Sequence, residues 1–347
     1  MRAIVEGDGD AGSLWARMTA LDWPALTVPE TAGGVGLGSV ELAVLAEELG
    51  RVLAPGPLLA TVSQFVPAVR ELGTSEQVAR FLGPVASGET AGTLALAEAG
   101  GRWAVDAVMT TVEPRGEGWV VSGEKRWVFE PSGAQEVVVI ARLPGTTGRD
   151  GITAVVAPVA DAQITPVNAF DASRELATVA FDEIGIGPDR VLGEPGGAAA
   201  GLDRVIEEAT VAVALETLGA CQVIFETALE YAKTREQFGK PIGSFQAVKH
   251  RLADLHLALE RARATCYFAA ATIAEDDGRR SVAVAMAKAA TGEAQQAVAQ
   301  DGIQLLGGIG FTWEHDQHLW VKRAKSGDAL FGTAAEHRAR VADLLDL

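Results

Sequence analysis

The chain has 347 residues, of which 48% are hydrophobic and 22% are charged, and its formal net charge is −17. It is long enough for a large core divided into two or three parts. The negative charge disfavours nucleic acid and anionic membranes as partners. We expect no signal peptide and no membrane-spanning run, and hence a cytoplasmic protein. Cys221 and Cys266 lie in apolar helical segments and are expected to be buried, without a disulfide or a metal.

Residues 1–91 are expected to form an N-terminal helical domain, with short helices separated by glycine and proline. A helix is predicted from Trp15 to Leu21, and a glycine-rich run follows at 33–38. That run is not a dinucleotide fingerprint, because no strand precedes it. An amphipathic helix is predicted from Ser39 to Leu49. Its apolar residues Leu42, Leu45, Ala46 and Leu49 share one face, and Glu41, Glu47 and Glu48 are expected to point away.

Residues 92–190 change to alternating and β-branched patterns punctuated by glycine, which predict an antiparallel, barrel-like middle domain. Residues 182–201 are rich in glycine and proline and are predicted to be a linker. Residues 198–347 return to helical periodicity and predict a helical bundle. Helical ends around a strand-rich middle give an α+β fold of three parts.

A helix-helix corner is predicted at Arg235–Gln246, between long helical segments at Val211–Tyr231 and Ala247–Ala274. Gly239 and Pro241 break the first helix, and Ser244 is expected to cap the second. An exposed arginine, a lysine and glutamines at such a corner suit a phosphate group, although a solvated turn has the same composition.

Two further clusters invite a functional interpretation. His315 and His318, with Asp316 between them, have a spacing compatible with metal ligation, but a polar helix start is favoured because no other Cys or His cluster is near. Trp313 and Trp320 are expected to pack rather than to stack on a ligand.

The corner, extended as Tyr231–Pro241 and Phe245–Asp254, and the run Gln304–His315 together resemble the acyl-CoA dehydrogenase family. The resemblance implies an N-terminal helical domain, a middle β-barrel and a C-terminal four-helix bundle. It also implies FAD as cofactor, α,β-dehydrogenation of an acyl-CoA thioester with a glutamate as base, and an electron-transferring flavoprotein as electron acceptor.

The nucleotide half of the family's FAD site is retained. In the family, such residues hold the pyrophosphate and adenine of the FAD that belongs to the neighbouring subunit. The matching positions here are Arg235, Phe238, Gln246, Gln304, Gly307 and Gly308.

The catalytic half departs from the family pattern. Phe331 stands before Gly332-Thr333, where the family commonly has its base, and phenylalanine cannot accept a proton. Some members place the base on the first C-terminal helix instead, at a position that aligns with Ala209, beside Glu207 and Glu208.

The flavin-ring contacts are changed as well. Ala97 replaces a threonine and Phe129 replaces a hydroxyl residue, although Trp127 is kept.

With these departures, the chain resembles the short subunit of the α2β2 acyl-CoA dehydrogenases that act in steroid side-chain degradation. We therefore expect a subunit without a catalytic base that completes the FAD site of a second, catalytically complete subunit. Two alternatives stay open. One is an independent homodimer that uses Glu208 as base, and the other is a flavin-free scaffold.

Overall fold

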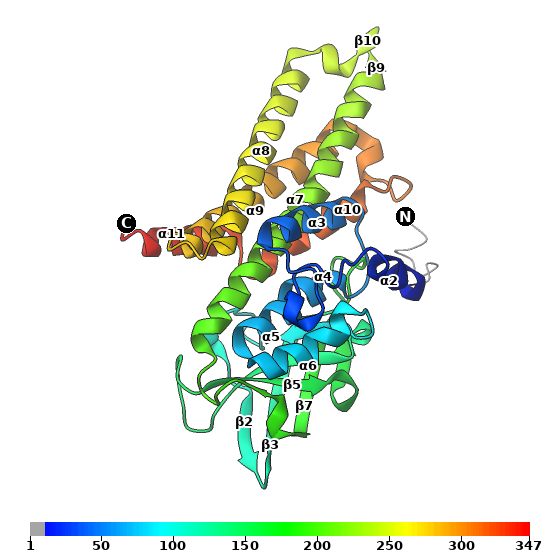
Figure 1. Cartoon of the computed structure of the whole chain (residues 1–347). Coiled ribbons are helices and arrows are strands. Elements are labelled where there is room, and N and C mark those ends of the chain that lie inside the picture. The colour runs from blue at the N-terminus through cyan, green and yellow to red at the C-terminus, as the bar shows by residue number, and fades with distance from the viewer. Residues whose placement is uncertain (1–10) are drawn as a thin grey trace. The chain divides into compact units, whose positions relative to one another are not determined.

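Helices occupy both ends of the chain and strands occupy its middle, as the sequence predicts (Figure 1). The computed structural model describes residues 11–347, so the prediction that no signal peptide begins the chain falls partly on residues 1–10, outside the described residues. Two compact units result. One contains Ala43–Ala54 and Thr210–Leu347, and the other contains the described residues up to Leu42 and Pro55–Ala209.

The N-terminal helices are short, as expected. They are α2 (Ala11–Thr19), η1 (Glu30–Ala32), α3 (Ser39–Arg51), α4 (Leu58–Ala60), the π-helical turn η2 (Thr61–Phe65), α5 (Val66–Leu72) and α6 (Ser75–Ala86). The first predicted helix thus begins earlier and ends at Thr19. Thr74 closes a capping box on α6 with Gln77, which fixes the start of that helix.

Helix α3 confirms the predicted amphipathic helix, and Leu42, Ala46 and Leu49 are buried. The expectation for Glu47 was wrong, because its side chain is only 9% exposed. Its carboxylate accepts hydrogen bonds from Arg263 Nε at 2.9 Å and from the Tyr267 hydroxyl at 3.0 Å. Glu47 therefore takes part in a buried polar contact with the C-terminal helices.

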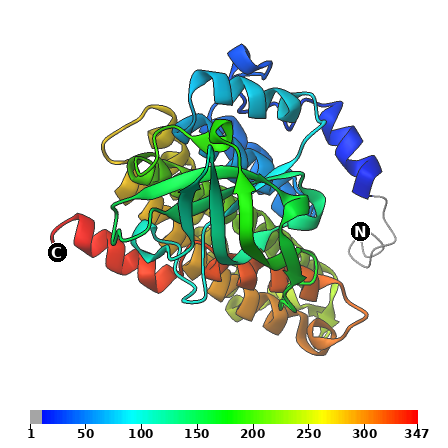
Figure 2. The same cartoon turned by 90° about the horizontal axis from the view of Figure 1, so that it is seen from below.

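The strands of the middle segment form one sheet of eight strands within the described residues, and they lie side by side in Figure 2. They are β1 (Gly92–Ala95), β2 (Thr111–Arg115), β3 (Gly118–Phe129), β4 (Glu136–Arg142), β5 (Ile152–Pro158), β6 (Gln163–Pro166), β7 (Leu176–Ile186) and β8 (Val191–Leu192). The order is β6-β7-β3-β2-β4-β5-β8, with β1 paired to β4. Valines from β2, β3, β4 and β5 build the core of this sheet.

Two details of the sheet correct the sequence prediction. The sheet is mixed rather than purely antiparallel, because β4 pairs in parallel with both β1 and β2. The predicted linker at 182–201 contains the end of β7, the turn η6 (Pro188–Arg190) and all of β8, which pairs with β5.

The C-terminal segment is helical. Its elements are α7 (Ala199–Thr234), β9 (Glu236–Gln237), β10 (Lys240–Pro241), η7 (Ile242–Ser244), α8 (Gln246–Ala274), α9 (Arg280–Leu306), η8 (Gly307–Phe311), α10 (Gln317–Ala329) and α11 (Ala334–Leu344). Helix α7 has the length and apolar composition of a membrane span, but 89% of its most apolar window is buried inside the protein. It is therefore a core helix, as its alanine and valine content suggests.

Helices α8 and α9 form an antiparallel hairpin. Three contacts along it establish the direction: Arg251 with Asp301, Arg261 with Glu293, and Cys266 with Thr291. The start of α8 consequently lies beside the end of α9. Ser244 does not cap α8 as expected, because the N-cap position is Phe245 and no side chain caps it.

Candidate functional site

The corner between α7 and α8 is a two-residue hairpin. Helix α7 ends where the Arg235 N–H donates to Tyr231 O at 2.8 Å, and Arg235 O accepts from the Ile242 N–H at 2.8 Å. Strands β9 and β10 pair antiparallel around Phe238 and Gly239, whose φ angles of 55° and 78° are both positive. Gly239 suits this turn, whereas a phenylalanine there is strained. The turn leaves the Phe238 ring 92% exposed.

Positive charge gathers at this corner. Arg235 and Lys240 are exposed, and the Arg235 guanidinium makes no ion pair with any residue that the structure describes. Lys240 Nζ lies 4.5 Å from the centroid of the Phe245 ring, and that ring meets Phe238 edge to face at 6.1 Å. An unpaired guanidinium on a chain of net charge −17 favours an anionic, fork-shaped ligand such as a phosphate.

The second retained block lies at the end of α9. Gly307 adopts φ 64° and ψ −140°, a conformation open mainly to glycine. A Cβ at Gly307 or at Gly308 would meet no atom within 4 Å, so the backbone there faces open space. Gln304 is exposed one turn earlier. The Gly307 N–H donates to Gln304 O, so what this turn offers a ligand is close approach to the glycine backbone and the exposed Gln304 side chain.

The structure brings the two blocks to the same end of the α8–α9 hairpin. Arg251, five residues after Gln246, pairs with Asp301 at 3.1 Å, and Asp301 precedes Gln304 by three residues. An exposed guanidinium, an exposed aromatic ring and open glycine backbone are the groups that a dinucleotide diphosphate requires. The nucleotide half of FAD therefore fits these residues.

The two blocks expected at the flavin ring are adjacent within the sheet unit. The Arg126 N–H donates to Ala97 O at 2.7 Å, and Lys125 Nζ donates to Leu96 O at 3.1 Å and to Glu98 Oε1 at 2.7 Å. Burial lowers the pKa of Lys125 to about 8, against the attraction of Glu98. Burial alone would raise the pKa of Glu98, but Lys125 and the backbone N–H groups of Thr110 and Met109 together lower it. This ion pair fixes the two blocks against each other.

Apolar groups occupy the two changed positions. Ala97 is fully buried and Phe129 is 1% exposed. The Phe129 ring lies edge to face with Trp103 at 6.4 Å, and the Arg174 guanidinium lies 4.8 Å from its centroid. Neither position offers a hydroxyl, and the Phe129 ring instead contacts Trp103 and Arg174. Ala97 and Phe129 therefore do not supply the hydroxyl contacts to a flavin ring that these positions carry in the family pattern.

The turn that carries the usual base is intact, but it holds a phenyl group. Phe331 is 3% exposed with φ 57°, and its carbonyl accepts from His337 Nε2 at 2.8 Å. Thr333 and Glu336 close a capping box that starts α11. Burial lowers the pKa of His337 to about 4, which keeps this hydrogen-bond donor neutral. The turn is thus well ordered without a proton acceptor at Phe331.

The alternative base, Glu208, is 7% exposed and is ion-paired with Arg70. Arg70 Nε also donates to Glu71 Oε1 at 3.0 Å. Burial opposes the charge of Arg70, but the two carboxylates prevail and raise its pKa. Ala209, which aligns with the family's second base position, is fully buried. A proton transfer to Glu208 would have to disrupt this ion pair.

The other candidates have structural roles. His315 Nδ1 accepts from the Gln317 N–H at 3.1 Å, His318 packs on Trp313 at 4.8 Å, and the described residues contain no metal-binding cluster. Trp320 donates to Arg51 O at 2.9 Å and packs as expected. Trp313 is 67% exposed, and its packing is limited to His318 and to Lys322, whose Nζ lies 4.6 Å from the ring centroid.

Both cysteines are buried and free, and burial raises the pKa of each thiol to about 12.

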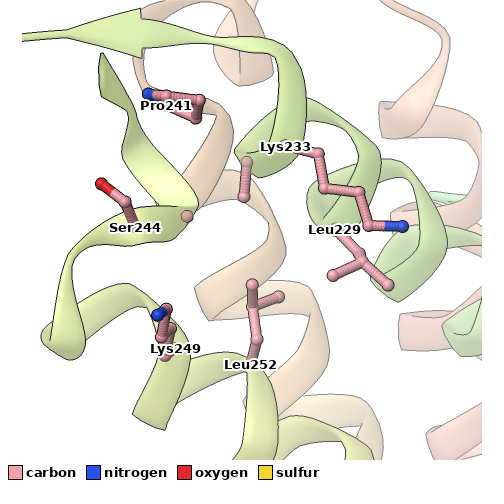
Figure 3. A pocket seen from close by; sticks show the side chains of 8 residues that line it. Leu229, Lys233, Pro241, Ser244, Lys249 and Leu252 are labelled. Carbon is pink, nitrogen blue, oxygen red and sulfur yellow. The ribbon is translucent and has the colours of Figure 1, made fainter. Parts of the chain in front are cut away.

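Sequence reasoning missed a pocket beside the corner. Its volume is 490 Å³, and residues of α7, α8 and the connection between them line it (Figure 3). Leu229 and Leu252 form its apolar floor, and Lys233 and Lys249 flank it. The lysines lie sixteen residues apart in the sequence, so no local pattern joins them.

Comparison with known proteins identifies the family. Residues 4–89 match the acyl-CoA dehydrogenase N-terminal domain, and residues 200–345 match the C-terminal domain. The mitochondrial short-chain specific acyl-CoA dehydrogenase of Bos taurus is 30% identical over 94% of this chain and 80% of its own length. Acyl-CoA dehydrogenase IpdE2 of Mycobacterium tuberculosis is 32% identical over 97% of this chain and 88% of its own length.

Among solved structures, the ChsE4-ChsE5 complex from Mycobacterium tuberculosis contains a similar chain, with a TM-score of 0.86 and 25% identity over 96% of this chain and 88% of that one. The fold and the sequence relatives agree. The chain belongs to the acyl-CoA dehydrogenase family, whose cofactor is FAD.

Proposed function

We propose that this chain is the subunit of a heteromeric acyl-CoA dehydrogenase that lacks the catalytic base and completes the FAD site of its partner. One contrast carries the proposal. Arg235 is exposed and unpaired at a corner suited to phosphate, whereas Phe129 is buried and stacked where a flavin ring would need a hydroxyl. The groups that serve a neighbour's cofactor are kept, and those that serve the chain's own cofactor are lost.

The chain's residues then act as a clamp on a nucleotide. Arg235 would hold the pyrophosphate with its charged fork, and the open backbone at Gly307 and Gly308 would allow close approach. The exposed Phe238 ring supplies apolar surface for a planar base. FAD held at these residues would supply the hydride acceptor for the dehydrogenation. Phe331 accepts no proton, so the base comes from the partner's glutamate.

The partner and the substrate follow from the same proposal. We infer an α2β2 assembly in which the second subunit is catalytically complete, and the existence of a ChsE4-ChsE5 complex of similar fold supports a pair of unlike subunits. The substrate class is an acyl-CoA thioester, with a steroid side-chain ester as the specific proposal. An electron-transferring flavoprotein is the proposed acceptor and the cytoplasm the proposed location. We also propose three domains: an N-terminal helical domain at 1–91, a middle β-domain at 92–190 and a C-terminal helical bundle at 198–347.

The deciding experiment compares the chain expressed alone with the chain co-expressed with a second acyl-CoA dehydrogenase subunit encoded beside it. The visible spectrum and the flavin-to-protein ratio are measured after gel filtration. We expect flavin only in the complex, at one FAD per pair of unlike subunits, together with acyl-CoA oxidation.

Each alternative gives a different result. A yellow homodimer with one FAD per chain and activity of its own would support the independent enzyme and make Glu208 the leading base. A complex whose FAD content is unchanged by Arg235→Ala would support the flavin-free scaffold.

A further inference from the structure

The pocket beside the corner, named here the corner groove, combines an apolar floor with positive charge. Leu229, Ala232 and Leu252 provide the floor, and Lys233 and Lys249 flank it on opposite helices (Figure 3). Its volume of 490 Å³ falls in the range of roughly 300–1,000 Å³ typical of ligand clefts. Such a groove suits a short segment that carries both leucine side chains and carboxylates.

The electrostatic contrast with the rest of the chain is strong. Between residues 229 and 252 the cations Lys233, Arg235, Lys240, Lys249 and Arg251 face only two carboxylates, Glu230 and Glu236, while the whole chain carries −17. Lys233 is paired with Glu230 at 2.6 Å. Lys249 makes no ion pair with any described residue. One ammonium group beside the groove therefore has an unused charge.

The chain itself contains a segment of complementary chemistry, Asp343–Leu347. Leu344, Leu345 and Leu347 are 44%, 50% and 90% exposed, and they alternate with Asp343 and Asp346. Exposed leucines beside carboxylates match an apolar floor flanked by lysines. The segment follows α11, which lies well away from β9 and β10 in the same unit, so it does not reach its own groove (Figure 1).

We propose that the corner groove is a docking site for the segment Asp343–Leu347 of a second copy of this chain. The leucines bury their side chains against Leu229 and Leu252, and the carboxylates of Asp343 and Asp346 approach Lys249. This contact differs from the nucleotide clamp, which uses Arg235, Phe238 and the glycine turn. It joins two copies of the same subunit, and it requires no bound FAD.

Site-directed cross-linking of the full-length chain tests the contact, both alone and in the co-expressed complex. One tagged copy carries Ser244→Cys at the groove, and a differently tagged copy carries Leu345→Cys; both positions are exposed. A short bismaleimide joins cysteines that come close together. The native Cys221 and Cys266 are buried and do not compete. The matched control replaces Ser244→Cys with Thr165→Cys, an exposed position on β6 in the other compact unit.

We expect a mixed cross-linked dimer from Ser244→Cys with Leu345→Cys and little from the control pair. Lys249→Glu should reduce the yield about tenfold, and Asp343→Lys with Asp346→Lys on the other copy should restore it. Equal cross-linking of the control pair, or a yield unaffected by Lys249→Glu, would overturn the proposal. Cross-linking of Ser244→Cys to the unlike subunit instead would assign the groove to that partner and also reject the proposal. Flavin content plays no part in this readout, so the result is independent of the proposed function.

Discussion

Arg323 Nη1 donates to Glu216 Oε1 at 2.6 Å, and the two side chains are only 1% and 2% exposed. The pair joins α10 to α7 inside the C-terminal unit. Taking two charges out of water is costly, and the pair is stable only while each charge has the other. The ion pair therefore anchors α10, which leads into the turn at Phe331, to α7.

Removing one member of this pair should be severely destabilising. Arg323→Met removes the guanidinium that donates to the buried Glu216 carboxylate, and we expect the free energy of unfolding to fall by roughly 3–5 kcal/mol. Urea denaturation followed by tryptophan fluorescence measures the change. The double variant Arg323→Met, Glu216→Leu should recover much of the loss. Arg338→Ala, which breaks an exposed pair with Glu293, is the control and should cost about 1 kcal/mol or less. A double variant as unstable as the two single losses added together would contradict this account.

His337 should make the protein sensitive to acid. Its folded pKa is about 4, whereas an unfolded histidine takes up a proton near its ordinary value of about 6.5. Between these values the unfolded state binds more protons, so stability falls as the pH drops from about 6.5 to about 4. The largest loss is roughly 3 kcal/mol.

The comparison with His337→Gln isolates this contribution, because the amide can still donate to Phe331 O but does not titrate. Free energies of unfolding are measured for both proteins from pH 7 to pH 4. The wild-type protein should lose stability faster than the variant over this range. Parallel curves would show that His337 does not titrate between these limits.

Sequence patterns located the corner well, since helices α7 and α8 contain the predicted segments Val211–Tyr231 and Ala247–Ala274. Long runs of helical periodicity carry that information locally. The prediction that Glu47 points to solvent was wrong because the decisive contacts are not local. Its partners Arg263 and Tyr267 lie more than 200 residues away in the chain, and periodicity alone places a glutamate outside.

At the candidate site, too, the local changes could be predicted from the sequence and the long-range contacts could not. The loss of hydroxyls at Ala97 and Phe129 was visible in the sequence, but the stack of Trp103 and Arg174 on Phe129 depends on the folding of the sheet unit. The Arg251–Asp301 pair that sets the two nucleotide blocks at one end of a hairpin likewise has no local signal.

Glu208 should not be needed for turnover. Because its carboxylate is held by Arg70, Glu208→Gln in the co-expressed complex should keep kcat within about twofold while costing on the order of 1–3 kcal/mol in stability. Steady-state kinetics, flavin content and thermal unfolding are measured together. Glu71→Gln, which alters the other carboxylate on Arg70, is the matched control and should behave alike. A large fall in kcat for Glu208→Gln alone, with FAD still bound, would assign the base to Glu208.

Arg235 should control FAD retention by the complex. Its guanidinium is exposed and unpaired, so Arg235→Ala removes a charged fork without breaking a hydrogen bond or an ion pair to a described residue. A charge-assisted hydrogen bond contributes roughly 1.5–3 kcal/mol, and we therefore expect the FAD dissociation constant to rise about 10- to 100-fold with unchanged thermal stability of the apoprotein. Fluorescence titration of the apo-complex measures the constant.

Two further variants separate the fork from the charge. The FAD dissociation constant of Arg235→Lys should lie between those of the wild-type protein and Arg235→Ala, because lysine keeps the charge and loses the fork. Arg279→Ala, at an exposed arginine paired with Asp277, controls for the loss of one positive charge and should leave FAD binding unchanged. Equal weakening by Arg279→Ala would mean that net charge alone, and not the corner, determines affinity.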